Sequence, residues 1–237
     1  MAVTPIPIVA LDFPDAEEAL SLVRRLGDSC AFYKVGSELF TTCGPSIVEA
    51  LRNEGKRVFL DLKFHDIPNT VRSASRAAAS CGASLLTVHA LGGRGMIEAA
   101  VEGAGQECGV LGVTVLTSLD AATFGGAIGR RVESIPDEVS RLSTVVAHAG
   151  AHGVVCSGQE AERVSREHRR LAILVPGIRL SGDATHDQSR VVTPEGGARA
   201  GATYLVLGRT VTAASDPADA MRRVHAELTK ADRSPAP

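Results

Sequence analysis

The chain has 237 residues, of which 44% are hydrophobic and 22% are charged, as expected of a soluble globular protein. Its formal net charge is −2 with both signs interspersed, so no sustained basic surface favours nucleic acid as a partner. The apolar stretches are too short to cross a bilayer and the N-terminus lacks a basic segment before its apolar run, so we expect a cytoplasmic protein that makes no membrane contact.

Apolar, β-branched runs predict eight strands, at 6–11, 31–36, 57–63, 84–90, 110–117, 153–157, 171–178 and 203–209. Helical periodicity or composition lies between them, at 15–27, 45–54, 70–81, 94–107, 136–151, 158–168, 194–200 and 216–230. This alternation predicts an α/β fold, a closed (β/α)₈ TIM barrel, with a doubly wound open sheet as the alternative. Because no linker divides the chain, we predict a single domain over 1–230 and a flexible C-terminal tail at 231–237.

The third predicted strand leads into FLDLKFHDIPNTV, residues 59–71, which concentrates charge behind an apolar run. Alternate residues of a strand share a face, so Asp61 and Lys63 should project to the same side. Asp66 follows where the strand should end, and the next helix should begin near Val71. Taken alone, a salt bridge on the surface would also explain these charges.

Polar residues gather at the C-terminal ends of the predicted strands, the end of a TIM barrel that carries function. They are Asp12 after the first strand, Lys34 in the second, Asp61 and Lys63 in the third, Thr117 and Ser118 at the end of the fifth, Arg179 after the seventh, and Gly208 and Arg209 at the end of the eighth. Unrelated surface residues would not favour one rim, so this placement indicates a catalytic pocket.

The loops after the seventh and eighth strands are where such barrels often bind phosphate. Gly208 would let the backbone approach closely, and Arg209 would add a planar pair of donors. The polar loop 180–190 would contribute Gln188. We therefore expect a phosphate monoester as ligand, although a capping role would also explain Arg209.

Lys63 lies between carboxylates in the sequence, which favours its ammonium form and argues against an imine mechanism. Lys34 and Asp12 would complete an alternating network if they face the same pocket. A cationic lysine of this kind would stabilise a developing carbanion and then protonate it. We expect no metal, because the ammonium occupies the position of a cation, although Mg²⁺ stays open if Lys63 turns away. We also expect no cofactor, because the sequence has no nucleotide-binding glycine signature and no lysine suited to an imine.

The sequence DLKFHDIPNTV resembles very closely the active-site signature of the orotidine 5′-monophosphate decarboxylase family, which catalyses the last step of de novo UMP synthesis. Further blocks resemble that family in the same order, namely IVALDF at 8–13, FYKVGSELF at 32–40, VTVLTS at 113–118, VVCSGQEA at 154–161, VPGIR at 175–179 and YLVLGRTVT at 204–212. The likeness covers nearly the whole chain, with the spacing of the shorter bacterial form. It implies a TIM barrel that converts orotidine 5′-monophosphate to UMP and CO₂ without a cofactor.

The resemblance also implies a role for each matching residue. Lys63 would protonate C6 after CO₂ leaves, Asp61 would lie against the substrate carboxylate, and Lys34 would join the charged network. Asp66 and Thr70 would enter the partner subunit's active site, which implies a homodimer with shared sites. The other substrate-binding positions would be Asp12 for the ribose, Thr117 and Ser118 for the pyrimidine and ribose, Arg179, Gln188, Gly208 and Arg209 for the phosphate, and Pro176 among them.

Two alternatives stay open. The Mg²⁺-dependent decarboxylases of 3-keto-L-gulonate 6-phosphate share a D-x-K-x-x-D core and a phosphate site, although IPNTV and VTVLTS favour orotidylate. A catalytically silent barrel that binds a nucleotide or sugar phosphate is the second, and the retained Asp61, Lys63 and Asp66 argue against it. The loop 119–130 is least like the family, so its part in closing the site is left open.

Overall fold

The computed structural model describes residues 4–180 and 191–233, in which eight parallel strands close into a barrel. They are β1 (Ile6–Leu11), β2 (Phe32–Gly36), β3 (Arg57–Phe64), β4 (Leu85–His89), β5 (Gly109–Val113), β6 (Gly153–Val155), β7 (Ala172–Val175) and β8 (Tyr204–Leu207). Each strand pairs with its neighbour in sequence, and β8 returns to pair with β1, Val206 lying opposite Ile8. The predicted TIM barrel is confirmed, and the open sheet is wrong because its first and last strands would not pair in this order.

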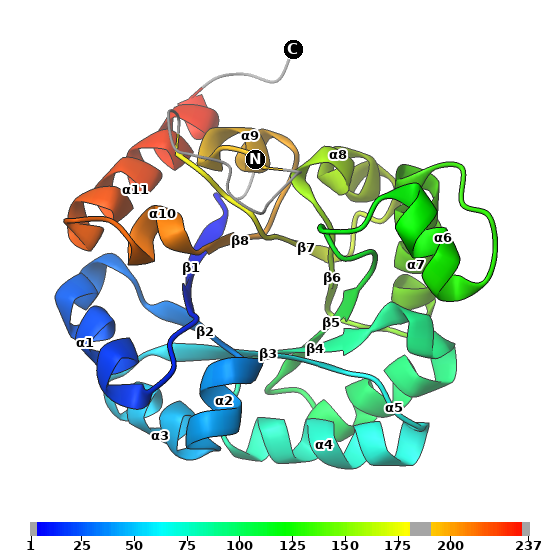
Figure 1. Ribbon diagram of the computed structural model, residues 1–237, viewed down its shortest axis with the longest axis horizontal. Coiled ribbons are helices and arrows are strands. Elements are labelled where there is room, and N and C mark those ends of the chain that lie inside the picture. The colour runs from blue at the N-terminus through cyan, green and yellow to red at the C-terminus, as the bar shows by residue number, and fades with distance from the viewer. Residues whose placement is uncertain (1–3, 181–190, 234–237) are drawn as a thin grey trace.

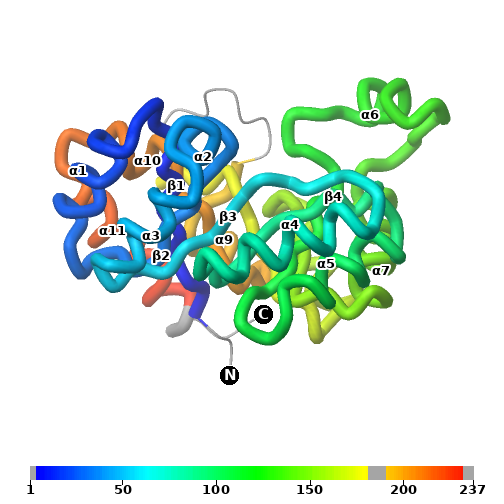
Figure 2. The backbone as a smooth tube through the Cα atoms, turned by 90° about the horizontal axis from the view of Figure 1, so that it is seen from below, coloured from blue at the N-terminus to red at the C-terminus, as the bar shows by residue number. Residues whose placement is uncertain are grey.

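Helices form a ring outside the strands (Figure 1). Those that the sequence predicts are α1 (Ala16–Leu26), α3 (Ser46–Asn53), α4 (Pro68–Ser80), α5 (Gly93–Ala104), α7 (Ile135–His148), α8 (Gly158–Glu167), α9 (Pro194–Arg199) and α11 (Pro217–Arg233). The short elements that it does not predict are α2 (Ser37–Cys43), α6 (Ala121–Ile128), α10 (Arg209–Thr212) and the 3₁₀ turns η1 (Gly27–Ser29) and η2 (Ala90–Gly92). Because α2, α6 and α10 follow β2, β5 and β8, they gather at the C-terminal end of the barrel (Figure 2).

The fifth strand is shorter than predicted. β5 ends at Val113, and the next residue, Thr114, still donates its N–H to the Val155 carbonyl at 3.2 Å before the chain leaves the sheet. Thr117 and Ser118 therefore lie in the loop after β5 and not at a strand end.

Other element boundaries also differ from the prediction. α4 begins at Pro68 and not near Val71, since proline suits the first turn of a helix, where its missing N–H is not needed. β8 ends at Leu207, so that Gly208 caps α10 and Arg209 is the first residue of that helix. α11 continues to residue 233, past the predicted domain boundary at 230, and 234–237 lie outside the described residues.

The barrel interior is filled by apolar side chains from the strands, namely Ile8, Ala10, Phe32, Phe59, Leu85, Leu111, Leu174, Tyr204 and Val206. A larger apolar layer lies between the strands and the helices. Four of the interior side chains, Ala10, Phe59, Leu174 and Val206, also line the cavity described below, so they form its apolar floor. Across the described part of the chain, no helix is long and apolar enough to cross a membrane.

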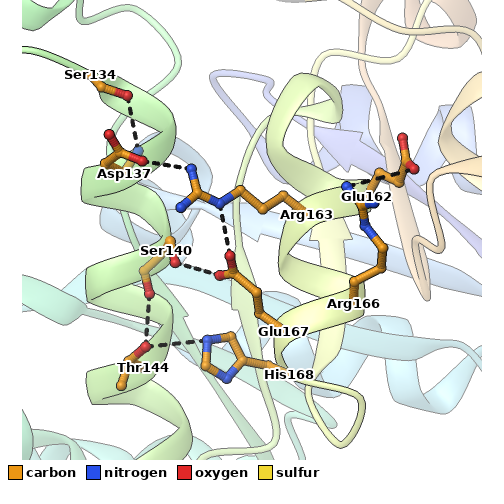
Figure 3. Close-up of polar contacts among 9 residues, drawn as sticks. All are labelled: Ser134, Asp137, Ser140, Thr144, Glu162, Arg163, Arg166, Glu167 and His168. Carbon is orange, nitrogen blue, oxygen red and sulfur yellow. Dashed lines mark hydrogen bonds and ion pairs between the residues drawn. The ribbon is translucent and has the colours of Figure 1, made fainter.

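α7 and α8 are also joined by polar contacts near the surface (Figure 3). Arg163 of α8 donates to Asp137 at 2.7 Å and to Glu167 at 2.8 Å, and the Ser140 hydroxyl donates to Glu167. The hydrogen bonds from Arg163 hold the pKa values of both carboxyl groups below their usual range. These groups are exposed, so solvent weakens the contribution of their ion pairs to stability.

Candidate active site

A cavity of about 470 Å³ opens at the C-terminal end of the barrel. It brings together most of the predicted site residues, namely Asp12, Lys34, Asp61, Lys63, Thr117, Pro176, Arg179, Gly208 and Arg209. The acidic residues and lysines come from the side of β1, β2 and β3, and the two arginines come from the segments after β7 and β8. The cavity thus has an apolar floor, one wall of alternating charges and one cationic wall.

The wall of alternating charges, called the charged wall below, consists of Asp12, Lys34, Asp61 and Lys63. Their side chains form a connected chain. The Lys63 ammonium lies 2.9 Å from both carboxylate oxygens of Asp61, and the Lys34 ammonium lies 2.7 Å from Asp12 and 3.9 Å from Asp61. The side chains of Lys34 and Asp61 are only 10% and 15% exposed, so their interaction is weakly screened. A Cβ on Gly36 would lie 3.0 Å from the Lys34 nitrogen and 3.1 Å from the Asp12 carboxylate, so this glycine leaves room for the pair.

A bulge in β3 brings Lys63 back toward Asp61. Leu60 lies opposite Leu86 of β4, but Phe64 lies opposite Val88, so β3 carries more residues than its partner between these pairs. Lys63 adopts φ 50°, a left-handed conformation that costs a residue other than glycine about 1 to 3 kcal/mol. The prediction that Asp61 and Lys63 share a side is confirmed, but an irregular strand produces it.

Thr87 of β4 contacts two residues of the site and was not predicted from the sequence. Its hydroxyl accepts the backbone N–H of Lys63 and donates to Asp61, both at 2.9 Å. The signal was a hydroxyl within the apolar run SLLTVHA, because a buried hydroxyl needs a hydrogen-bond partner.

Asp66 and Thr70 do not line the cavity of their own chain. Both are exposed, Asp66 between β3 and α4 and Thr70 in the first turns of α4. The Asp66 carboxylate accepts the N–H of Ile67 at 2.6 Å, and the Ile67 side chain between them is 67% exposed. A polar and an apolar group therefore point outward beside the cavity.

The cationic wall combines a buried and an exposed arginine. Arg179 is buried and held through its backbone N–H to the Val192 carbonyl and through its guanidinium to the Ile178 carbonyl. Arg209 is exposed at the start of α10. Among the described residues, a Cβ on Gly208 would meet no atom within 4 Å, so this part of the chain leaves the space beside the glycine open to a ligand. Gln188 lies outside the described residues.

The loop after β5 contributes Thr117 to the cavity, whereas Ser118 is exposed and does not line it. The following segment, 119–130, contains α6, which Asp120 caps by accepting the N–H of Thr123 at 2.8 Å. Figure 2 shows that α6 stands apart from the ring of helices. Its far end is tied to α7 because Arg130 donates to both carboxylate oxygens of Glu138 at 2.6 Å.

Two histidines stack beside the charged wall. The rings of His65 and His89 are 5.5 Å apart. Burial, together with His65 and Lys63, lowers the pKa of His89 and so favours its neutral form. In the described residues, no group of three or more His, Cys, Asp or Glu side chains could hold a metal ion.

Comparison with known proteins identifies the family. The sequence profile of the orotidine 5′-phosphate decarboxylase / HUMPS family matches residues 5–224. A Pseudomonas paraeruginosa protein named orotidine 5′-phosphate decarboxylase is 46% identical over 225 residues, covering 93% of this chain and 96% of its own. The Nitrosococcus oceani protein of the same name is 46% identical over 228 residues, covering 94% and 97%.

A solved structure agrees with these sequence comparisons. Orotidine 5′-phosphate decarboxylase from Lactobacillus acidophilus is similar with a TM-score of 0.84 and 35% identity, covering 95% of this chain and 99% of that one. Fold and sequence therefore match over almost the full length of the chain, and the alternating charges lie within the matched region. The chain belongs to the orotidine 5′-phosphate decarboxylase / HUMPS family.

Proposed function

We propose that the protein decarboxylates orotidine 5′-monophosphate to UMP and CO₂. The observation that carries this proposal is the Lys63 ammonium, which lies 2.9 Å from both oxygens of Asp61 in a cavity with arginines on its other wall. The names of the relatives that are 46% identical support this substrate. A silent barrel would have no need for the strained Lys63 backbone.

In the proposed reaction, the bond between C6 and the carboxylate carbon breaks, CO₂ leaves, and the electron pair stays on C6. The ammonium of Lys63 has three N–H donors, and its contacts to Asp61 leave one for the substrate. That N–H would stabilise the developing charge and then transfer its proton to C6, after which solvent would reprotonate the amine. Asp61 would lie next to the substrate carboxylate, and Lys34 would balance its charge.

The rest of the substrate would extend toward the arginines. Asp12 would bind the ribose, while Thr117 and Ser118 would contact the ribose and the pyrimidine. The phosphate would bind at Arg179, Gly208 and Arg209, where backbone and guanidinium donors suit an anion. Pro176 lines the cavity beside them, and Gln188 stays a prediction. Phosphate binding far from C6 would help to organise the charged wall.

The active protein would be a homodimer in which Asp66 and Thr70 complete the partner subunit's site. Within the described part of its own chain, Asp66 has no cationic partner, and it lies outside the cavity. Beside it Ile67 exposes 67% of its surface and would be covered by a second copy. The predicted cytoplasmic location stays a prediction.

Turnover of two substrates tests this function. Protein treated with a chelator should convert orotidine 5′-monophosphate to UMP and leave 3-keto-L-gulonate 6-phosphate unchanged, even after Mg²⁺ is restored. Turnover of the keto-sugar phosphate with Mg²⁺ would instead favour the Mg²⁺-dependent activity. Binding of UMP without turnover of either compound would point to a silent barrel.

A further inference from the structure

Thr87 lies in the middle of β4, where the neighbouring strand residues Leu86 and Val88 are apolar and fully buried. Its side chain is itself 1% exposed, and it does not line the cavity. A buried hydroxyl without hydrogen bonds would destabilise the fold. Among the described residues, both of the hydrogen bonds that its hydroxyl makes go to residues of the charged wall, Lys63 and Asp61.

The direction of these hydrogen bonds is fixed. A backbone N–H only donates, so the Thr87 oxygen must accept from Lys63. The hydroxyl proton is then directed to the Asp61 carboxylate, which only accepts when ionised. One hydroxyl thus binds the backbone of the proposed proton donor and the side chain of the carboxylate beside it.

The position of Thr87 explains this double contact. The residues before and after it pair with Leu60 and Phe64 of β3, so Thr87 lies opposite the bulge. In a regular ladder a backbone carbonyl would accept the N–H that here goes to the Thr87 hydroxyl. The side chain therefore replaces part of the interrupted ladder where Lys63 adopts φ 50°.

We propose that Thr87 is a positioning residue that holds the Lys63 backbone and the Asp61 carboxylate in their reactive arrangement. It acts through these residues and does not touch the substrate. This inference rests on the proposed decarboxylation, but its structural part can be measured without substrate.

The test compares Thr87→Val, which keeps the shape and removes the hydroxyl, with Thr87→Ser, which keeps the hydroxyl. Thr203→Val is the matched control, because the Thr203 hydroxyl also accepts a strand N–H, that of Ile173 at 3.1 Å, just before β8 at the opposite end of the barrel. Thr87→Val should lower kcat about 10- to 100-fold, since small misplacement of reacting groups has effects of this size. KM and the Kd for UMP should change less than about threefold, and Thr87→Ser should restore most of kcat.

Three results would overturn this inference: an unchanged kcat in Thr87→Val, an equal loss in Thr87→Ser, or an equal loss in Thr203→Val. Hydrogen exchange of the Lys63 amide gives a second readout that a threonine acting only by packing would not move. Exchange should be faster in Thr87→Val than in Thr87→Ser, and an equal rate would contradict the proposed contact. If the unmutated protein fails to decarboxylate orotidine 5′-monophosphate, the proposed function fails, and the exchange rates still decide the role of Thr87.

Discussion

The Lys63 ammonium contacts both carboxylate oxygens of Asp61, which lies two residues before it in β3. The contact forms where the strand bulges and Lys63 takes a left-handed backbone conformation. Such a conformation persists only when surrounding structure holds it, and here the buried strands on either side supply that support. The contact between Lys63 and Asp61 thus forms at an irregularity of the barrel wall.

Shared active sites predict complementation between two inactive variants. Lys63→Ala and Asp66→Ala homodimers should each show little turnover, because every site lacks one component. Random mixing makes about half of the dimers heterodimers with one intact site, so activity should recover to about a quarter of that of the unmutated protein. Activity of the mixture before and after denaturation and refolding together would measure this recovery. Inactivity despite heterodimers seen by native mass spectrometry would contradict the shared site.

If Arg209 binds the phosphate, its loss should weaken UMP binding more than the loss of the nearby Arg223. Arg209→Ala should weaken UMP binding about 10- to 100-fold, since a charge-assisted hydrogen bond contributes about 1.5 to 3 kcal/mol. Arg223 is the matched control, because it lines an adjacent surface pocket and not the cavity. Calorimetry with UMP and with uridine would measure the effect, which should vanish for uridine. Equal weakening by Arg223→Ala would argue against a specific phosphate contact.

Glu138 predicts stability that depends on pH. Burial raises its pKa, but hydrogen bonds from Arg130 and Arg141 outweigh burial and lower it. A lowered folded-state pKa stabilises the protein above the unfolded-state value, and this stabilisation is lost as pH falls through the folded-state pKa. At pH 7, Glu138→Gln should therefore lower the free energy of unfolding by about 1 to 3 kcal/mol.

Denaturant unfolding at several pH values would check this expectation. The difference between Glu138→Gln and the unmutated protein should shrink as pH falls below the ordinary pKa of glutamate, about 4.3, toward the lowered folded-state pKa. Arg163→Ala, which removes the exposed ion pairs of Arg163 with Asp137 and Glu167 (Figure 3), should cost less than about 1 kcal/mol. A larger loss of unfolding free energy in Arg163→Ala than in Glu138→Gln would show that burial does not determine how much each carboxylate interaction stabilises the protein.

His89 should make the stability of the protein depend on pH in a less acidic range than Glu138 does. Burial, His65 and Lys63 lower its pKa, so the unfolded chain binds more protons at mildly acidic pH. Stability should be complete above the unfolded-state pKa, about 6.5, and should fall as pH drops toward the folded-state value. His89→Asn should flatten the dependence of Tm on pH just below about 6.5, whereas the exposed His148→Asn should not. Parallel curves for His89→Asn and the unmutated protein would contradict the neutral form of this half-buried histidine.

Strand order and the residues of the charged wall were predictable because they depend on local pattern. Val115 shows the limit of that pattern: it lies after the end of β5 but is apolar and lines the cavity, so the apolar run continues beyond the strand. α6 was not predicted, since Gly125 and Gly126 lower its helix propensity while the burial of Phe124 compensates. Tertiary packing, and not the local sequence pattern, determines where β5 ends and that α6 forms.

The bulge in β3 could not be predicted from the sequence. Lysine has no preference for the left-handed conformation that Lys63 adopts, so no local signal announces it. The hydroxyl of Thr87 that supports this conformation comes from another strand, 24 residues along the chain. Only pairing of β3 with β4 brings the two together.

The most direct measurement is the absorbance of orotidine 5′-monophosphate incubated with protein treated with a chelator, for the unmutated chain, Lys63→Ala and Lys230→Ala. Lys230 is exposed on α11, so its variant controls for the loss of a lysine. We expect the orotate absorbance to disappear and UMP to form with the unmutated protein and Lys230→Ala. With Lys63→Ala, turnover should fall below detection while UMP still binds. Full turnover by Lys63→Ala would contradict the role of this ammonium as the proton donor.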